Sequence, residues 1–458
     1  MARHKRNDQL SALLSEAGWS AAELARAVNA LGAAQGLALR YDRTAVAHWL
    51  TGSRPRPVVA TLAASALSRR CDRLVAVDDT GLIPGVPVSE GLGKTYGTGQ
   101  GDAVTALVAL CRAEADLIRR PFVTQSVYDL AAPTGQLSWT PTRPSPALLR
   151  DKGHQPTLAD VSRLREMSIL FTDLTERHGG AHARYALAAY LSDDVSRLLI
   201  TPVRSPSLRR ELFTGAAQLT HLLARMSIDA GHAGLAQRYY ASALALAREA
   251  ADPAVYAITL RAMSVQALSL GYHQRARQLA EAAVEAVGPR SDAATRSFLL
   301  SQRALTQACV RHRNAALADL RAAESEHGRA SSPPGPFSAY PRAGLDYQRA
   351  RTLLALGDTD SATQALISAV KARPDHQRRT SALTHARLAE TLLRTGQLDT
   401  ACVHWHTFLD YYPHLHSQPI SQAFTRLLKV LRPHERQRHA SGVIQRAHTM
   451  THSPLISM

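Results

Sequence analysis

Glycine residues recur at similar intervals in the second half of this 458-residue chain, each between two helix-forming segments. Gly231, Gly271, Gly357 and Gly396 occupy four of these turns, and Arg313 stands at the corresponding turn between Gly271 and Gly357. The successive intervals are 40, 42, 44 and 39 residues. Recurrence at this spacing is typical of stacked helix pairs, in which each pair buries its apolar face against the next. This part of the chain is therefore predicted to be an α-helical solenoid.

Small residues follow each of these turns, in the segments 236–241, 276–280, 315–318 and 361–365. Alanine is the best helix former, and its small side chain lets two helices cross closely. A turn residue followed by alanines resembles the tetratricopeptide (TPR) repeat, and this resemblance implies an all-α array over residues 157–458. Composition agrees, because aromatic residues, which β-strands favour, make up only 5% of the chain. The proline-containing segment 331–341 is predicted to be a loop between two pairs.

The first seventy residues have a different pattern, that of short helices in a compact module. Leucines at i, i+3 and i+4 between residues 7 and 17 form one apolar helix face, and Gly18 ends this helix. Ser20 and Glu23 form a capping box at the start of a second helix. A loop with two glycines follows, and it leads to a third helix.

The third helix is predicted to begin after Asp42, a suitable N-cap, and to end at Leu50. Val46, Trp49 and Leu50 are spaced to pack inward. The outward face then carries Arg43, Thr44, Ala47 and His48. Arginine can bind guanine through two hydrogen bonds and a methyl group can contact thymine, so these four residues are predicted to face base edges in the major groove. For His48, capping of its own helix or exposure to solvent is the alternative.

Basic residues surround this helix. Residues 1–70 contain ten Lys or Arg against four Asp or Glu, a net charge of +6. We expect an N-terminal arm to contact the DNA backbone or minor groove, and Arg54 and Arg56 to contact phosphates. The complete basic set of the prediction is Arg3, Lys5, Arg6, Arg40, Arg54 and Arg56. A plain helical module with a solvated basic face is the alternative interpretation.

The order of these elements carries a family resemblance. The aromatic Trp49 near the end of the third helix is followed by Gly52 and then by Pro55. This order resembles the Cro/repressor-like (XRE) helix-turn-helix family, although the loop before residue 42 is longer than in the shortest members. The resemblance implies that residues 1–76 are a DNA-binding domain that acts as a dimer on paired half-sites.

Two irregular stretches separate this domain from the array. Residues 77–102 are rich in Gly, Pro and acidic residues and are predicted to be a flexible linker. Residues 103–156 are predicted to be a helical connector with a Pro-rich loop, in which Trp139 packs onto the array. The glycines around Lys94 do not make a phosphate-binding loop, because Val88 replaces its first glycine and no strand precedes it.

Further segments extend the likeness over most of the chain. The stretch Gly179-Gly180-Ala181-His182-Ala183-Arg184-Tyr185 and the segment 229–244, together with the N-terminal module, resemble the actinobacterial helix-turn-helix/TPR regulators, including the NsdA-like group. The resemblance implies a sequence-specific transcriptional regulator, commonly a repressor of development or secondary metabolism. The array is expected to mediate homodimerisation, and an effector, either a peptide or an acidic small molecule, is an open alternative for its inner groove.

Other classes of protein are not indicated. The formal net charge of +17 favours a polyanionic partner such as double-stranded operator DNA, although an arginine-rich genome produces the same excess. We find no catalytic constellation, cofactor motif or metal motif, so an enzyme is not expected. Four isolated cysteines and the lack of a long apolar run fit a cytoplasmic, nucleoid-associated protein without a membrane segment. The alternative is a TPR-type protein-interaction scaffold without specific DNA binding.

Overall fold

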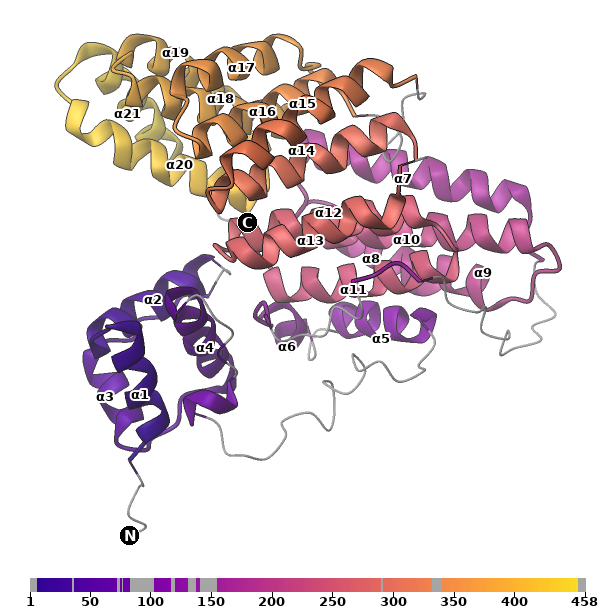
Figure 1. The fold of residues 1–458 in the computed structure, drawn as a ribbon, viewed down its shortest axis with the longest axis horizontal. Helices are drawn as coiled ribbons and strands as arrows, with labels where there is room; N and C mark the ends of the chain where they lie inside the picture. The colour runs from indigo at the N-terminus through magenta and orange to yellow at the C-terminus, as the bar shows by residue number, and fades with distance from the viewer. Residues whose placement is uncertain are drawn as a thin grey trace.

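The computed structural model describes residues 6–34, 37–71, 75, 77–82, 103–116, 120–130, 137–140, 155–289, 291–331 and 340–451. Within these ranges every regular element is a helix, which confirms the predicted all-α fold (Figure 1). Buried hydrophobic residues gather in one core at 10–82, one at 104–299 and one at 350–447, with a smaller cluster around Tyr340. None of the described helices is long and apolar enough to cross a bilayer.

The N-terminal domain has its own core. Its elements are α1 (Asp8–Ala17), α2 (Ala21–Ala34), α3 (Arg43–Leu50), α4 (Pro57–Cys71) and the short 3-10 helix η1 (Asp78–Thr80). Asn7 caps α1 by accepting from the Leu10 amide at 3.0 Å and donates to the carbonyl of Thr80 at 2.9 Å. Leu82 is buried in the same core. Residues 77–82, assigned to the linker from sequence, thus lie against this domain, and residues 83–102 lie outside the described part.

The connector places two helices on the array, α5 (Ala103–Ala115) and α6 (Arg120–Thr124). Both contact α11 (Ala233–Glu249). Trp139 lies 5.1 Å from Tyr256, measured between ring centroids, and packs against the large core. The predicted packing of Trp139 is therefore confirmed, whereas most of the Pro-rich loop, including residues 141–154, lies outside the described residues.

The array consists of stacked helix pairs, as the spacing of the turns predicts. It begins with α7 (Leu158–His178), α8 (Arg184–Tyr190) and α9 (Ser196–Ile200), where a π-helical turn (Leu191–Val195) joins α8 to α9. The pairs are α10 (Pro206–Asp229) with α11, α12 (Pro253–Ser269) with α13 (His273–Val287), α14 (Ala293–Cys309) with α15 (Arg313–Arg329), α16 (Arg342–Ala355) with α17 (Thr359–Lys371), and α18 (Arg378–Arg394) with α19 (Leu398–Tyr411). The last helices are α20 (Gln418–Leu431) and α21 (Arg438–Thr451).

The turns inside the five pairs share one geometry. His232 N donates to the carbonyl of Ser227 at 2.8 Å, five residues back, and the same bond recurs at residues 272, 312, 358 and 397. This is the Schellman ending of a helix, which requires a left-handed residue before the donor. Four of these residues are the predicted glycines. The array is therefore a TPR-like α-solenoid by its own repeating geometry.

The predicted turn residue Arg313 is wrong by two positions. The left-handed residue of that turn is Arg311, with φ of 65°, and Arg313 is the first residue of α15. A non-glycine residue in this conformation costs of the order of 1 kcal/mol. Because the chain has arginine here instead of glycine, the sequence does not mark the position of the turn. With Arg311 in place, the turn interval after Gly271 is 40 residues, equal to the preceding one.

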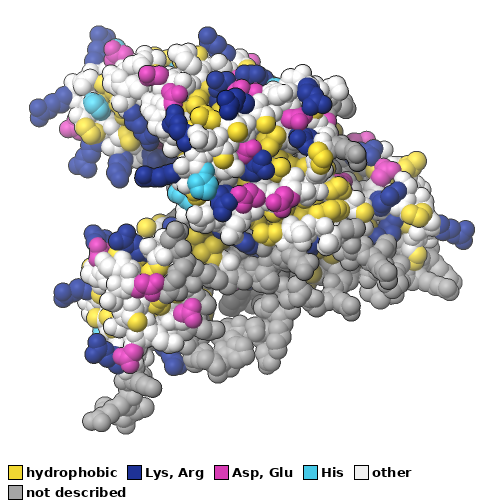
Figure 2. Space-filling view, in the orientation of Figure 1, with side chains coloured by type: hydrophobic (Ala, Val, Ile, Leu, Met, Phe, Trp, Pro, Cys, Tyr) yellow, Lys and Arg dark blue, Asp and Glu magenta, His cyan; other side chains and the backbone are white. Residues whose placement is uncertain are grey.

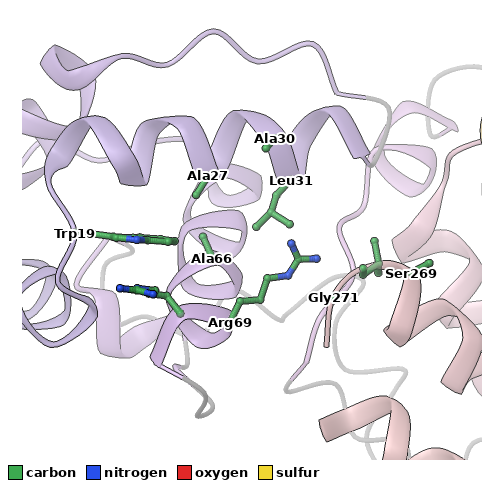
Figure 3. A pocket seen from close by; sticks show the side chains of 10 residues that line it. Trp19, Ala27, Ala30, Leu31, Ala66, Arg69, Ser269 and Gly271 are labelled. Atoms are coloured by element: carbon green, nitrogen blue, oxygen red, sulfur yellow. The ribbon is translucent and has the colours of Figure 1, made fainter. Parts of the chain in front are cut away.

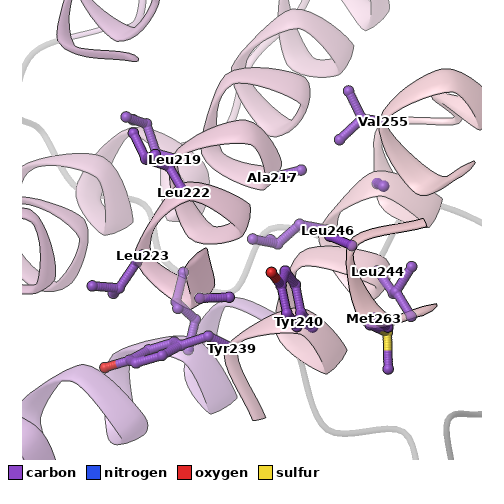
Figure 4. Packing of buried hydrophobic residues seen from close by; sticks show 14 of the residues in the cluster. Ala217, Leu219, Leu222, Leu223, Tyr239, Tyr240, Leu244, Leu246, Val255 and Met263 are labelled. Atoms are coloured by element: carbon purple, nitrogen blue, oxygen red, sulfur yellow. The ribbon is translucent and has the colours of Figure 1, made fainter. Parts of the chain in front are cut away.

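Two adjacent tyrosines of α11 are buried in the large core at residues 104–299. Tyr239 and Tyr240 on α11 are both almost completely buried and lie among leucines of α10 such as Leu219 and Leu223 (Figure 4). The Tyr239 hydroxyl donates to the buried carboxylate of Glu114 on α5, which is also ion-paired with Arg184. The connector is thereby held on the array by apolar packing together with a buried polar contact.

A second long-range contact joins the beginning of the array to its end. The amide of Ala181 donates to the carbonyl of His416 at 3.2 Å, and the His416 amide donates to the carbonyl of His178 at 2.7 Å. Asp229 at the end of α10 accepts from Arg379 at 2.8 Å, and also from the Gly180 amide and the Ser417 hydroxyl. We call this junction the clasp (residues 178–182, 414–417, Asp229 and Arg379).

Candidate functional site

Helix α3 is fixed in position by its neighbours. Asp42 accepts from the Ala45 amide at 2.9 Å, as predicted for the N-cap. The side chain of Asn29 on α2 binds both the carbonyl and the amide of Tyr41, at 2.7 and 2.9 Å. The Tyr41 ring then lies 5.3 Å from that of Trp49. The long loop before α3 is therefore tied to α2 immediately before the helix begins.

The two faces of α3 have the predicted orientation. Val46 and Trp49 are buried and Leu50 is half-buried. The four residues predicted to point outward are all exposed: Arg43, Thr44, Ala47 and His48. A helix of this length with one anchored and one free polar face has the shape that a recognition helix needs. Contact of this face with base edges stays a prediction.

The described basic residues near α3 are also exposed. Arg40 precedes the helix, and Arg54 and Arg56 follow it; neither these three nor Arg43 forms an ion pair with a described carboxylate. The guanidinium of Arg6 is within 3.8 Å of the Asp8 carboxylate, with both groups well exposed. The predicted arm residues Arg3 and Lys5 lie outside the described residues. The domain thus has free guanidinium groups around α3.

A second set of arginines lies on the first helices of successive pairs. We call it the arginine row: Arg225 on α10, Arg261 on α12, Arg351 on α16 and Arg387 on α18. Arg225 is exposed and the other three are half-buried. Arg261 donates to the carbonyl of Phe298 at 2.9 Å, and its guanidinium carbon lies 3.5 Å from the centroid of the Phe298 ring. The stacked first helices place these charges along one side of the array.

The arginine row has few anionic partners. Arg225, Arg261 and Arg351 form no ion pair with any carboxylate in the described part of the chain, whereas Arg387 is 3.3 Å from Glu390. Burial, together with the nearby charges of Arg351 and Arg225, lowers the pKa of Arg261 to about 10. Burial also lowers the pKa of Arg351, with Arg387 adding to the effect. An arginine with its pKa lowered by neighbouring cations is stabilised when an anion approaches.

Two buried rings lie beneath the first half of the row. His221 is buried, with its Nδ1 3.1 Å from the Thr259 hydroxyl and its ring 5.6 Å from that of Tyr240. Burial lowers the pKa of His221 to about 3, and the positive charges of Arg225 and Arg261 act in the same direction. His221 is therefore neutral at pH 7, and the local potential is positive.

Other arginines of the array bind carboxylates. Arg303 binds both oxygens of Asp319, at 2.6 and 2.7 Å, and Arg296 binds Glu326 at 3.0 Å. Arg225, Arg261 and Arg351 thus differ from these structural arginines. The row was not predicted from the sequence. A basic residue stands six to ten positions before each of the five turns, and Arg303, the one before Arg311, is bound by a carboxylate, so this spacing alone does not identify the row.

The last helices add an exposed basic surface that sequence analysis also missed. Lys429, Arg432, Arg436 and Arg438 on and between α20 and α21 are exposed and form no ion pair with described residues. Figure 2 shows Lys and Arg side chains on these helices and on the N-terminal domain, on both borders of a hollow between them. No group of three or more potential metal ligands occurs among the described residues.

Comparison with known proteins agrees with the boundaries of the N-terminal core. A family model described as the SP15 N-terminal domain matches residues 10–83. A search of curated proteins found no match. Among solved structures, the chain is similar to one in the crystal structure of the APC/C hetero-tetramer Cut9-Hcn1, with 15% identity and a TM-score of 0.34, covering 95% of this chain and 68% of that one.

Proposed function

We propose that this protein is an interaction scaffold whose array binds an acidic segment of a partner protein along the arginine row. The observation that carries the proposal is a pair of half-buried guanidinium groups, those of Arg261 and Arg351, without a carboxylate partner in the described part of the chain. Desolvated arginines bind carboxylates through charge-assisted hydrogen bonds, which are about twice as strong as neutral ones. Their placement on the first helices of stacked pairs suits an extended peptide, which presents side chains along its length.

The test uses the full chain and a fluorescein-labelled polyglutamate peptide of about ten residues, followed by fluorescence anisotropy. We expect saturable binding that weakens with salt, and no binding of the matched polyglutamine peptide. The double variant Arg261→Gln/Arg351→Gln should weaken binding about tenfold or more. Arg394→Gln, an exposed arginine outside the row, is the control. Equal affinities of the double variant and the control would reject the proposal.

A second function is favoured by the free polar face of α3: sequence-specific binding of duplex DNA. Arg43, Thr44, Ala47 and His48 are available to a major groove, and Arg54 and Arg56 to phosphates. As the family resemblance implies, the role would be transcriptional regulation, commonly repression, in the cytoplasm at the nucleoid. The array would then supply the homodimer contacts, so that two copies of α3 bind half-sites separated by about 34 Å or a multiple of it.

The DNA proposal is tested by selecting bound sequences from a random duplex pool with the full chain. We expect an enriched motif and a salt-sensitive gel shift. Arg43→Gln should cost about 1–3 kcal/mol at one base position and relax specificity there. Light scattering should report a dimer. No enrichment over the input pool would leave the scaffold as the function of the chain.

A further inference from the structure

Among the described residues, helix α4 of the N-terminal domain contacts the array at a small joint. The guanidinium carbon of Arg69 on α4 lies 4.7 Å from the ring centroid of Tyr272, at the turn between α12 and α13. Tyr272 in turn stacks on Tyr128, at 5.5 Å and 18° between planes. Val127 packs against the N-terminal core, while the neighbouring Asp129 binds Gln237 of α11. The segment 127–129 therefore bridges the two bodies.

A cavity of about 480 Å³ lies beside this joint. Figure 3 shows Trp19, Leu31 and the alanines of α2 and α4 on one side, with Ser269 and Gly271 of the array opposite. This volume is in the range of small-molecule sites, which are largely apolar with a few polar groups. The cavity is open to solvent and takes residues from both bodies, so its shape depends on how they are docked.

Two arginines give the cavity its charge, Arg69 and Arg70. The Arg69 guanidinium points across the cavity towards Gly271, and its pKa is lowered by burial. Neither arginine forms an ion pair with a described carboxylate. Glu23, the acidic group that acts on Arg70, has one carboxylate oxygen bound by the Ser20 amide and hydroxyl, both at 2.7 Å. The cavity thus combines an indole, aliphatic walls and two guanidinium groups; Nε of Arg70 already donates to the carbonyl of Ala17 at 2.9 Å, which leaves Arg69 as the main group for an anion.

We propose that this joint cavity is a binding site for a small organic carboxylate with a flat apolar body. The apolar body would lie against Trp19 and Leu31, and the carboxylate would bind Arg69. The ligand would contact both bodies only when they are docked, so it would bind the docked arrangement more tightly than any other. This difference in affinity would shift the equilibrium towards the docked arrangement. The site is independent of the polyglutamate and DNA functions proposed above.

Isothermal titration calorimetry of the full chain with 2-naphthoate tests the site, with the neutral alcohol 2-naphthalenemethanol as the matched probe. We expect one saturable site for naphthoate and an affinity at least about tenfold lower for the alcohol. Arg69→Gln should remove this difference by weakening naphthoate alone. Ala30→Phe, which places a ring in the cavity from an exposed helix position, should abolish binding of both probes. Arg394→Gln should bind as the unmodified chain does.

The link to docking is tested by hydrogen exchange. With naphthoate bound, exchange should slow both in residues 65–71 and in residues 268–273. Absence of saturable binding, an unchanged naphthoate affinity in Arg69→Gln, or protection of one side only would each overturn the proposal. Since neither nucleic acid nor peptide is present in these experiments, such a failure leaves the two proposed functions untouched.

Discussion

The array and the N-terminal domain use arginine in opposite ways. In the array, Arg379 and Arg303 bind buried or nearly buried carboxylates through two oxygens and so help to set how helices pack. In the N-terminal domain, Arg43 and Arg54 extend into solvent, and the fold rests on an apolar core around Leu24. The difference separates arginines that stabilise the fold from arginines that are free to bind. Within the array, Arg225, Arg261 and Arg351 have no carboxylate partner in the described part of the chain, and neither do exposed arginines such as Arg394.

The largest effect of this contrast is expected at the clasp. Asp229→Ala removes the partner of Arg379 and leaves a charge largely enclosed, which costs about 3–5 kcal/mol. Urea unfolding followed by circular dichroism should show the loss as a lower midpoint of the array transition. Asp410→Ala, which breaks an exposed pair with Arg446, should cost no more than about 1 kcal/mol. Similar losses in both variants would refute the distinction between enclosed and exposed pairs.

A smaller effect is expected from His221 beneath the arginine row. Its folded-state pKa of about 3 lies below the ordinary value of 6.5, so the unfolded chain binds the extra proton first. Stability from this group is present above pH 6.5 and is lost as pH falls, by about 2 kcal/mol between pH 7 and pH 5. Unfolding free energies at the two pH values measure it. His221→Gln should remove this part of the pH dependence, and an unchanged slope in that variant would contradict the assignment.

The smallest effect on stability is expected around α3. Arg54→Gln should change the free energy of unfolding by less than about 0.5 kcal/mol, because the side chain is exposed and unpaired. If the domain binds DNA, the same change should reduce the salt dependence of binding by about one phosphate contact. Thermal unfolding and a salt titration of DNA binding separate the two outcomes. A marked loss of stability would place Arg54 among the structural arginines instead.

The sequence predicted those features that interactions between neighbouring residues determine. The cap at Asp42, the inward Val46 and Trp49, and four of the five pair turns follow from periodicity and glycine placement over a few residues. The turn at Arg311 was misplaced because its left-handed residue carries a side chain. Contacts between distant segments had no such signal: Asp229 and Arg379 are 150 positions apart, and neither residue type indicates the other.

The candidate site divides in the same way. Exposure of Arg43 and His48 could be predicted, because it depends on one helix. The arginine row could not, since it depends on how five helix pairs stack and on which acids lie within reach. The joint cavity forms where the N-terminal domain and the array, each with its own hydrophobic core, contact one another. The spacing of apolar residues within helices does not predict such a contact.

In an open solenoid each repeat contacts only its neighbours. Its curvature can therefore change when a partner binds, and its end repeats can unfold separately. The clasp, with the hydrogen bonds of His416 to Ala181 and His178 and with Asp229 beside them, joins the first helices of the array to the last. This contact restrains the curvature of the array before any partner binds. If the array binds a segment along the arginine row, as proposed, that segment must fit this curvature, so selection among acidic segments would depend on their shape as well as on their charge.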